Sequence, residues 1–261
     1  RFYGGYSKMS DTWTLQDEAA SPYLQICKIA AQSSDAFNTF KSHGAYRHVL
    51  EHVAMEEGQQ YLDEIKIDFM DKLDEVKVND SLGSPVTYEY DKVGTISATT
   101  LRYLKNTSDI VTKFGTSFDS IVEIGGGYGG LCKVMSSFVD FENYLLVDLE
   151  ECNLLSRKYL SYFDLPTMSY RSEEIVVEDN FDLLISNYAF SECHKEVQLD
   201  YIERFVKKSD KFYMMHNNFH LEMGTIPHQE FVEIMSDTHD VEWHDDHGVE
   251  DAPKIIYGTI K

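Results

Sequence analysis

Residues 119–132 read Asp-Ser-Ile-Val-Glu-Ile-Gly-Gly-Gly-Tyr-Gly-Gly-Leu-Cys, and this stretch decides the fold. A short apolar run leads into five glycines, and residues at helical spacing follow them. Gly125, Gly127 and either Gly129 or Gly130 let the backbone turn sharply and approach a ligand, because no Cβ stands in the way. The N-terminal amides of the next helix would face that ligand. The stretch therefore predicts a strand, a nucleotide-cofactor loop and a helix.

Two classes of cofactor use such a turn. The spacing of Gly125, Gly127 and Gly130 matches the dinucleotide pattern G-x-G-x-x-G. Glu123 stands two residues before the first glycine, where its carboxylate would repel a pyrophosphate but attract a cationic sulfonium. The charge therefore favours S-adenosylmethionine, with S-adenosylhomocysteine as the product, over NAD. An NAD-dependent sugar oxidoreductase remains an alternative.

Length and charge narrow the functional classes. The chain has 261 residues, of which 43% are hydrophobic, enough for one large domain or for a domain with a substantial appendage. Its formal charge of −22 at pH 7 disfavours nucleic acid and anionic membrane surfaces as partners, because both attract basic patches. Methylation of nucleic acid is therefore not expected.

The cysteines and the apolar runs predict the compartment. Cys27, Cys132, Cys152 and Cys193 form no C-x-x-C pair, so neither a zinc knuckle nor a disulfide framework is indicated. No apolar run reaches the roughly 20 residues that span a bilayer, and the N-terminus lacks a signal-peptide pattern. We therefore expect a cytoplasmic protein without membrane insertion. The chain begins at Arg1, so it is either trimmed or one domain of a larger polypeptide.

The sequence pattern changes near residue 116. Residues 1–115 predict a mainly helical N-terminal cap that contributes to the substrate site, although a helical appendage with only a packing role fits as well. Within residues 116–261 strands and helices alternate, which is typical of a parallel α/β sheet. We expect a Rossmann-like class I methyltransferase fold here. Its seven-stranded sheet would carry helices on both faces and an antiparallel C-terminal hairpin.

Polar residues follow the predicted strands at their carboxyl ends, where ligands bind in open α/β sheets. Asp148 ends the second strand about 20 residues after the glycines, and its charged carboxylate suits the ribose hydroxyls. Ser172 follows the third strand, where a polar residue could meet the adenine amino group, although an exposed loop fits as well. The predicted cofactor-binding residues are Glu123, Gly125, Gly127, Tyr128, Asp148, Leu149, Ser172, Asn187 and Tyr188.

Several segments resemble the sugar O-methyltransferase family of class I S-adenosylmethionine-dependent enzymes. They are Leu50-Glu-His-Val with Gly58 and Tyr61-Leu62, Gly94-Thr-Ile-Ser-Ala-Thr-Thr-Leu-Arg-Tyr-Leu, Val122-Glu-Ile-Gly-Gly-Gly-Tyr-Gly-Gly, Leu146-Val-Asp-Leu and Ser186-Asn-Tyr-Ala-Phe-Ser-Glu. The resemblance implies cofactor binding by Glu123, Gly125, Gly127 and Asp148, and an acceptor site formed partly by the helical N-terminal part.

The resemblance also implies the acceptor, which would be a sugar or a terminal glycan residue. A place within a larger glycan-assembly polypeptide would fit such an acceptor. Composition and spacing alone lead only to methyl transfer to a small molecule. A non-catalytic module with the same fold is a further alternative.

A sugar hydroxyl becomes a good nucleophile only as it loses its proton, so a general base is expected beside the transferred methyl group. His216, at the end of the fifth predicted strand, is the first candidate, because histidine is tuned to neutral pH. Glu192 is the second candidate, either as the base or as the partner of a histidine, and His194 is the third.

Polar residues outside the strand ends could bind the acceptor. Thr95, Thr99 and Arg102 are predicted to do so together with Tyr188 and Asn217, although the threonines and their hydroxyl neighbours could simply cap a helix. The tail run His244-Asp-Asp-His247 could hold a divalent metal or sugar hydroxyls, but a solvated loop is favoured. We therefore expect no metal.

Overall fold

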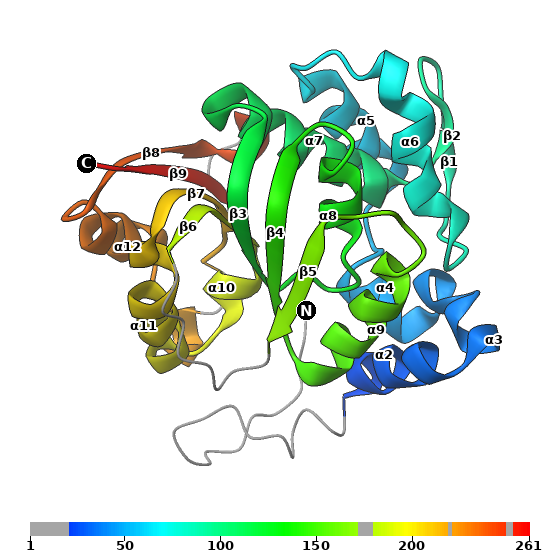
Figure 1. The fold of residues 1–261 in the computed structure, drawn as a ribbon, viewed down its shortest axis with the longest axis horizontal. Helices are drawn as coiled ribbons and strands as arrows, with labels where there is room; N and C mark the ends of the chain where they lie inside the picture. The colour runs from blue at the N-terminus through cyan, green and yellow to red at the C-terminus, as the bar shows by residue number, and fades with distance from the viewer. Residues whose placement is uncertain (1–20, 172–179, 219–220, 249–252) are drawn as a thin grey trace.

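The computed structural model describes residues 21–171, 180–218, 221–248 and 253–261. Their centre is a seven-stranded sheet in the order β5-β4-β3-β6-β7-β9-β8 (Figure 1). The strands are β3 (Ser117–Ile124), β4 (Asp140–Val147), β5 (Thr167–Arg171), β6 (Phe181–Asn187), β7 (Ser209–His216), β8 (His239–Asp245) and β9 (Lys254–Ile260). Strand β9 runs antiparallel to β7 and β8, and every other pairing in the sheet is parallel. The predicted seven-stranded fold with its C-terminal hairpin is confirmed.

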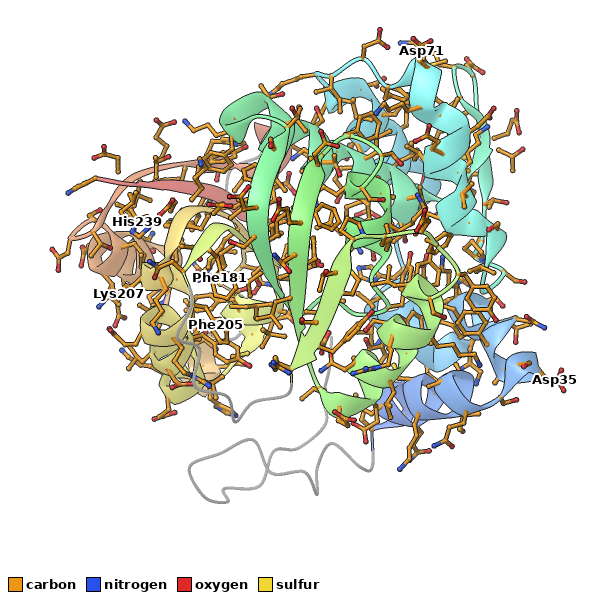
Figure 2. All side chains as sticks on the ribbon, viewed as in Figure 1. Asp35, Asp71, Phe181, Phe205, Lys207 and His239 are labelled. Carbon is orange, nitrogen blue, oxygen red and sulfur yellow. The ribbon has the colours of Figure 1, made fainter. Side chains whose placement is uncertain are left out.

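Helices cover both faces of the sheet, because neighbouring strand residues point to opposite sides. Ile121 belongs to the first apolar core and Val122 to the second. The first core includes α7 (Ala98–Phe114), α8 (Gly130–Met135) and α9 (Glu150–Leu160), and the second includes α10 (Ala189–Glu192), α11 (Lys195–Arg204) and α12 (His228–Met235). In Figure 2, Phe181 and Phe205 lie side by side in the second core, with ring centroids 6.4 Å apart.

The N-terminal part is mainly helical and shares the first core with the sheet. Its helices are α2 (Pro22–Gln32), α3 (Ser34–Phe37), α4 (Gly44–Val49), α5 (Met55–Glu64) and α6 (Leu73–Lys77), and a hairpin of β1 (Tyr88–Tyr90) and β2 (Gly94–Ile96) follows. Helix α2 packs on α9, and α5 packs on α7 (Figure 1). The domain boundary at residue 115 stays a prediction, and α7, which precedes it, packs against the sheet. No helix in the described ranges is both long and apolar enough to cross a membrane.

Helix α7 shows why its first residues carry hydroxyl groups. The Ser97 hydroxyl accepts a hydrogen bond from the Thr100 amide at 3.1 Å, so Ser97 is the N-cap. The same hydroxyl donates to Asp80 Oδ1 at 2.8 Å, and the Ser97 amide donates to the other oxygen of that carboxylate at 2.6 Å. Helix capping therefore accounts for Ser97 and Thr100.

A packing test follows from Gly258, which lies in β9 against the ring of Phe212. A Cβ at this position would overlap the ring. Adding a methyl group to a fully packed core forces side chains and backbone to shift, which costs about 1–3 kcal/mol. We therefore expect Gly258→Ala to lower the free energy of unfolding by that amount in urea denaturation. Gly44→Ala is the control, because no atom lies within 4 Å of its new methyl group and it opens α4. Equal stability of the two variants would contradict this packing account.

Candidate active site

The glycine loop joins β3 to α8 and holds backbone conformations that suit glycine. Gly125 has φ +78° and Gly127 has φ +57°, in the left-handed region where other residues are strained. A Cβ on Gly127 would also lie 2.6 Å from Leu50 Cδ1, and a Cβ on Gly125 would overlap the Ala189 methyl group. Backbone conformation and space therefore both require glycine here.

Asp148 ties the glycine loop to the neighbouring strand. Its Oδ2 accepts a hydrogen bond from the Gly127 amide, and its Oδ1 accepts one from the Leu149 amide, each at 2.7 Å. Burial raises the pKa of Asp148 to about 6, and the two backbone donors oppose this rise. Each carboxylate oxygen keeps a second lone pair, so Asp148 can also accept a hydrogen bond from a ligand hydroxyl.

Glu123 points into the first core beside the glycine loop. Its side chain is buried, and its Oε2 accepts a hydrogen bond from the Tyr144 hydroxyl at 2.8 Å. Burial raises the pKa of Glu123 to about 7, the Tyr144 bond opposes this rise, and the charge of Asp148 adds to it. Near neutral pH the carboxylate is therefore only partly ionised. A partly ionised Glu123 attracts a sulfonium and repels a pyrophosphate less strongly than the full charge that the sequence suggests.

The segment after α4 covers the glycine loop. The Leu50 side chain faces Gly127, and its carbonyl accepts hydrogen bonds from Arg102 at 3.2 Å and from the Thr99 hydroxyl at 3.5 Å. Two of the predicted acceptor-binding residues thus hold this segment in place. Their direct contact with an acceptor stays a prediction.

Two buried polar atoms close to this segment have no hydrogen-bond partner among the described residues. They are Glu51 Oε1 and the Tyr46 hydroxyl. An unpaired buried polar atom costs free energy, so both atoms suit the polar groups of a bound ligand. Glu51 belongs to the Leu50-Glu-His-Val segment of the resemblance, but neither Glu51 nor Tyr46 is among the predicted site residues, and it is their buried, unpaired atoms that point to a ligand.

The turn after β6 is strained. Tyr188 has φ +69°, which is uncommon for a residue with a bulky side chain, and its amide donates to the Met215 carbonyl at 2.8 Å. Asn187 Oδ1 accepts a hydrogen bond from the Asn106 side chain of α7 at 3.2 Å. Strained residues cluster at functional sites, which supports a ligand role for this turn.

Glu192 and Asn217 meet at the same edge of the sheet. The Asn217 side chain donates to Glu192 Oε1 at 3.1 Å, and the backbone N–H of Asn217 donates to the Ser191 hydroxyl at 3.2 Å. His194 is the N-cap residue of α11, two positions beyond Glu192, and is half-buried. The structure therefore joins two of these three predicted residues directly.

Thr95 and the side chain of Tyr128, which are also predicted to bind ligands, lie apart from Glu192 and Asn217. Thr95 is exposed on the β1–β2 hairpin, where its hydroxyl donates to Glu89 at 2.6 Å. Tyr128 is fully buried, and its ring packs between the helical cap and α9, 5.6 Å from the ring of Phe40 and 4.9 Å from that of Tyr159. The Tyr128 backbone belongs to the glycine loop, but its side chain is placed for packing. Ser172 lies outside the described residues.

His216 ends β7 inside the second core. It is 1% exposed, and its ring centroid lies 6.2 Å from that of Phe190 and 5.9 Å from that of Phe231. Neither ring nitrogen has a hydrogen-bond partner in the described part of the chain. Burial and, to a smaller extent, the charge of His228 lower the pKa of His216 to about 4. Its role as the general base stays a prediction, which this enclosure does not favour.

A cavity of about 250 Å³ lies between the C-terminal half of α7 and strands β8 and β9. Its walls include Lys66, Asp109, Lys113, Trp243 and Tyr257. No residue of the glycine loop lines it, so this cavity is separate from the predicted cofactor site.

No family model and no curated relative matches the chain. Among solved structures, the N-methyltransferase NodS from Bradyrhizobium japonicum WM9, in complex with S-adenosyl-L-homocysteine, is 10% identical over 78% of this chain and 98% of that chain, with a TM-score of 0.48. The pyocyanin biosynthetic protein PhzM is 17% identical over 63% of this chain and 56% of its own, with a TM-score of 0.48. The methyltransferase domain of bacterial CtHen1-C is 13% identical over 61% and 96%, with a TM-score of 0.47. At these identities and TM-scores the likeness assigns neither activity nor substrate.

The raised pKa of Glu123 predicts a pH-dependent stability. The folded chain holds this proton up to about pH 7, whereas the unfolded chain releases it near its ordinary pKa of 4.5. Stability is therefore lost as the pH rises through this window, by about 3 kcal/mol at most. We expect Glu123→Gln to be more stable than the wild type at pH 8 and similar to it near pH 4.5.

The measurement is urea denaturation of both proteins between pH 4.5 and pH 8. His216 works in the opposite direction, because its lowered pKa makes stability rise with pH, so only the difference between the two proteins isolates Glu123. A difference that does not change with pH would contradict the raised pKa.

Proposed function

We propose that the protein is an S-adenosylmethionine-dependent O-methyltransferase that acts on a hydroxyl of a sugar or terminal glycan residue. The observation that carries this proposal is the bond between the Gly127 amide and the Asp148 carboxylate. It joins a glycine loop to an acidic strand end at the edge of the sheet where ligands bind.

The residues present suit the cofactor. Asp148 would accept the ribose hydroxyls, and the glycines would let the ligand approach the backbone closely. Glu51 Oε1 and the Tyr46 hydroxyl would gain the hydrogen bonds that they lack. Once bound, S-adenosylmethionine supplies a methyl group on a sulfonium. At neutral pH Asp148, with a pKa of about 6, carries most of the negative charge that favours a cationic ligand over the pyrophosphate of NAD, and the partly ionised Glu123 adds less.

The acceptor site would lie beyond the end of β6. The aromatic rings of Tyr61 and Tyr188 and the guanidinium of Arg102 interact electrostatically, so they lie in one neighbourhood. Aromatic faces and charged donors suit a sugar, but the choice of a sugar over another small molecule rests on the resemblance of the sequence. Membership of a larger glycan-assembly polypeptide stays a prediction.

A non-catalytic binding module is the second candidate function. The strained turn at Tyr188 fits both candidates, because backbone strain is found at ligand clamps as well as at active sites. Methyl transfer by the purified chain distinguishes the two candidates.

Cofactor binding gives the first test. We expect S-adenosylhomocysteine to bind in isothermal titration calorimetry and NAD not to bind. Asp148→Asn should weaken binding of S-adenosylhomocysteine by roughly 10- to 100-fold, because a hydrogen bond to a charged group contributes about 1.5–3 kcal/mol. Asp164→Asn is the matched control, since Asp164 is an exposed carboxylate that lines a hollow beside the first residues of β4. Equal affinities of the two variants would remove Asp148 from the site.

Incubation with methyl-labelled S-adenosylmethionine and a panel of sugars and glycans tests the activity itself. Label on a hydroxyl of a sugar supports the full proposal, whereas label on other small molecules alone supports the transferase but removes the sugar. A chain that binds S-adenosylhomocysteine but labels neither a sugar or glycan nor another small molecule is a binding module.

A further inference from the structure

A carboxylate and an imidazole from distant parts of the chain form a pair near the strained turn. Glu64, the last residue of α5, lies 183 positions before His247, which belongs to the 3-10 turn after β8 (246–248). Their Oε1 and Nδ1 atoms are 2.8 Å apart. An ionised carboxylate can only accept, so Nδ1 carries the proton and Nε2 keeps its lone pair. Nε2 lies 3.8 Å from Asp246 Oδ2, which is beyond hydrogen-bond distance, so this nitrogen remains able to accept a proton.

The pair lies by the predicted acceptor site. The ring of His247 is 4.8 Å from that of Tyr61, which is on α5 with Glu64. Tyr188, in the turn after β6, has a pKa raised mainly by burial and then by the charges of Tyr61 and Asp246. Tyr61 and Asp246, which lie beside His247, thus also interact electrostatically with Tyr188. Unlike His216, His247 is not enclosed, since its side chain is 20% exposed.

The backbone of His247 is strained as well. Its φ of +52° lies in the left-handed region, where a histidine is uncommon. The surrounding contacts must maintain this conformation, and strain of this kind motivates a functional hypothesis.

A buried network holds the pair in position. Lys105 Nζ lies 2.9 Å from Asp109 Oδ2, 3.3 Å from Asp246 Oδ1 and 4.0 Å from Glu64 Oε2. The Tyr213 hydroxyl is 3.2 Å from Asp109 Oδ2 and 3.3 Å from Asn106 Oδ1. Asn106 also donates to Asn187 at the end of β6. Polar contacts therefore run without a break from the strand end to Glu64 and His247.

We propose that His247 is the general base of this enzyme and that Glu64 is its positioning residue. The inference rests on the proposed function, because it needs a hydroxyl acceptor. His247 Nε2 takes the hydroxyl proton while the acceptor oxygen bonds to the methyl carbon. The carbon–sulfur bond breaks with its electron pair left on sulfur, and the positive charge of the sulfonium passes to the imidazolium. Glu64 stabilises that charge through Nδ1.

A metal ion is the competing occupant. Glu64, Asp246 and His247 place one ligand atom each within 4.8 Å of one another, a geometry that could hold a divalent cation. The ammonium of Lys105 already interacts with Asp246 and Glu64, however, so both carboxylates have a cationic partner. The observations therefore favour the base.

The turnover of variants tests whether His247 or His216 is the general base. We expect His247→Ala to lower kcat by about 10²- to 10⁴-fold and Glu64→Gln to lower it by up to about 10⁴-fold, with the affinity for S-adenosylhomocysteine unchanged. Added imidazole should restore part of the activity of His247→Ala, which a merely structural role would not allow. His43→Ala, at an exposed histidine before α4, should keep wild-type turnover. His247→Gln replaces the alanine variant if the latter does not fold by circular dichroism.

A second measurement needs no cofactor. In ¹⁵N NMR of histidine-labelled protein above neutral pH, His247 should appear as the Nδ1-protonated tautomer, and Glu64→Gln should lose this preference. Loss of the tautomer preference in that variant identifies Glu64 as the group that orients the ring.

Three outcomes overturn the inference. Normal turnover of His247→Ala together with loss in His216→Ala would return the base to β7. Inactivation by EDTA, with recovery on adding magnesium or manganese, would make the three ligands a metal site. An Nε2-protonated His247 in the wild type would remove the lone pair that the base needs. Failure of the proposed function looks different, because the wild type would then label no hydroxyl at all.

Discussion

Two backbone amides that converge on the carboxylate of Asp148 determine the shape of the candidate site. The loop after β3 consists mostly of glycines, which lose more conformational entropy on ordering than any other residue. The bond from Gly127 to Asp148 offsets part of that cost and fixes the loop against β4. Burial of the carboxylate is tolerable because both oxygens receive N–H donors. The neighbouring Glu123 has a single donor, the Tyr144 hydroxyl, and burial raises its pKa to about 7.

The parts of the fold that could be predicted are those whose local pattern has one structural solution. The run Leu183–Ile185 is buried on both faces of the sheet and reads as continuous apolar sequence. The sequence predicts strands that begin at Ser120 and Asn143, and β3 and β4 each begin three residues earlier. Ser117 pairs with Asp140 through the backbone, and exposed first residues carry no apolar signal.

The site could be predicted where strand ends meet and could not be predicted where helices bring distant residues together. Gly127 and Asp148 lie on adjacent parallel strands, so strand order alone makes them neighbours. Glu64 and His247 meet because α5 and the turn after β8 both lie against Lys105 of α7, an arrangement that no local sequence pattern specifies. Tyr128 misleads for a related reason, since its place in the glycine motif does not reveal that its ring turns toward Phe40 and Tyr46 of the helical cap.

The packing of α2 on α9 also affects how the chain can fold. Lys158 of α9 donates a hydrogen bond to the carbonyl of Ala30 in α2, 128 positions away. During synthesis from the N-terminus, the apolar face of α2 therefore cannot be buried against α9 until α9 has left the ribosome. Contacts so distant in sequence slow folding and leave apolar surface exposed in the nascent chain. A chaperone that shields this surface would have most to protect before the glycine loop and α9 emerge.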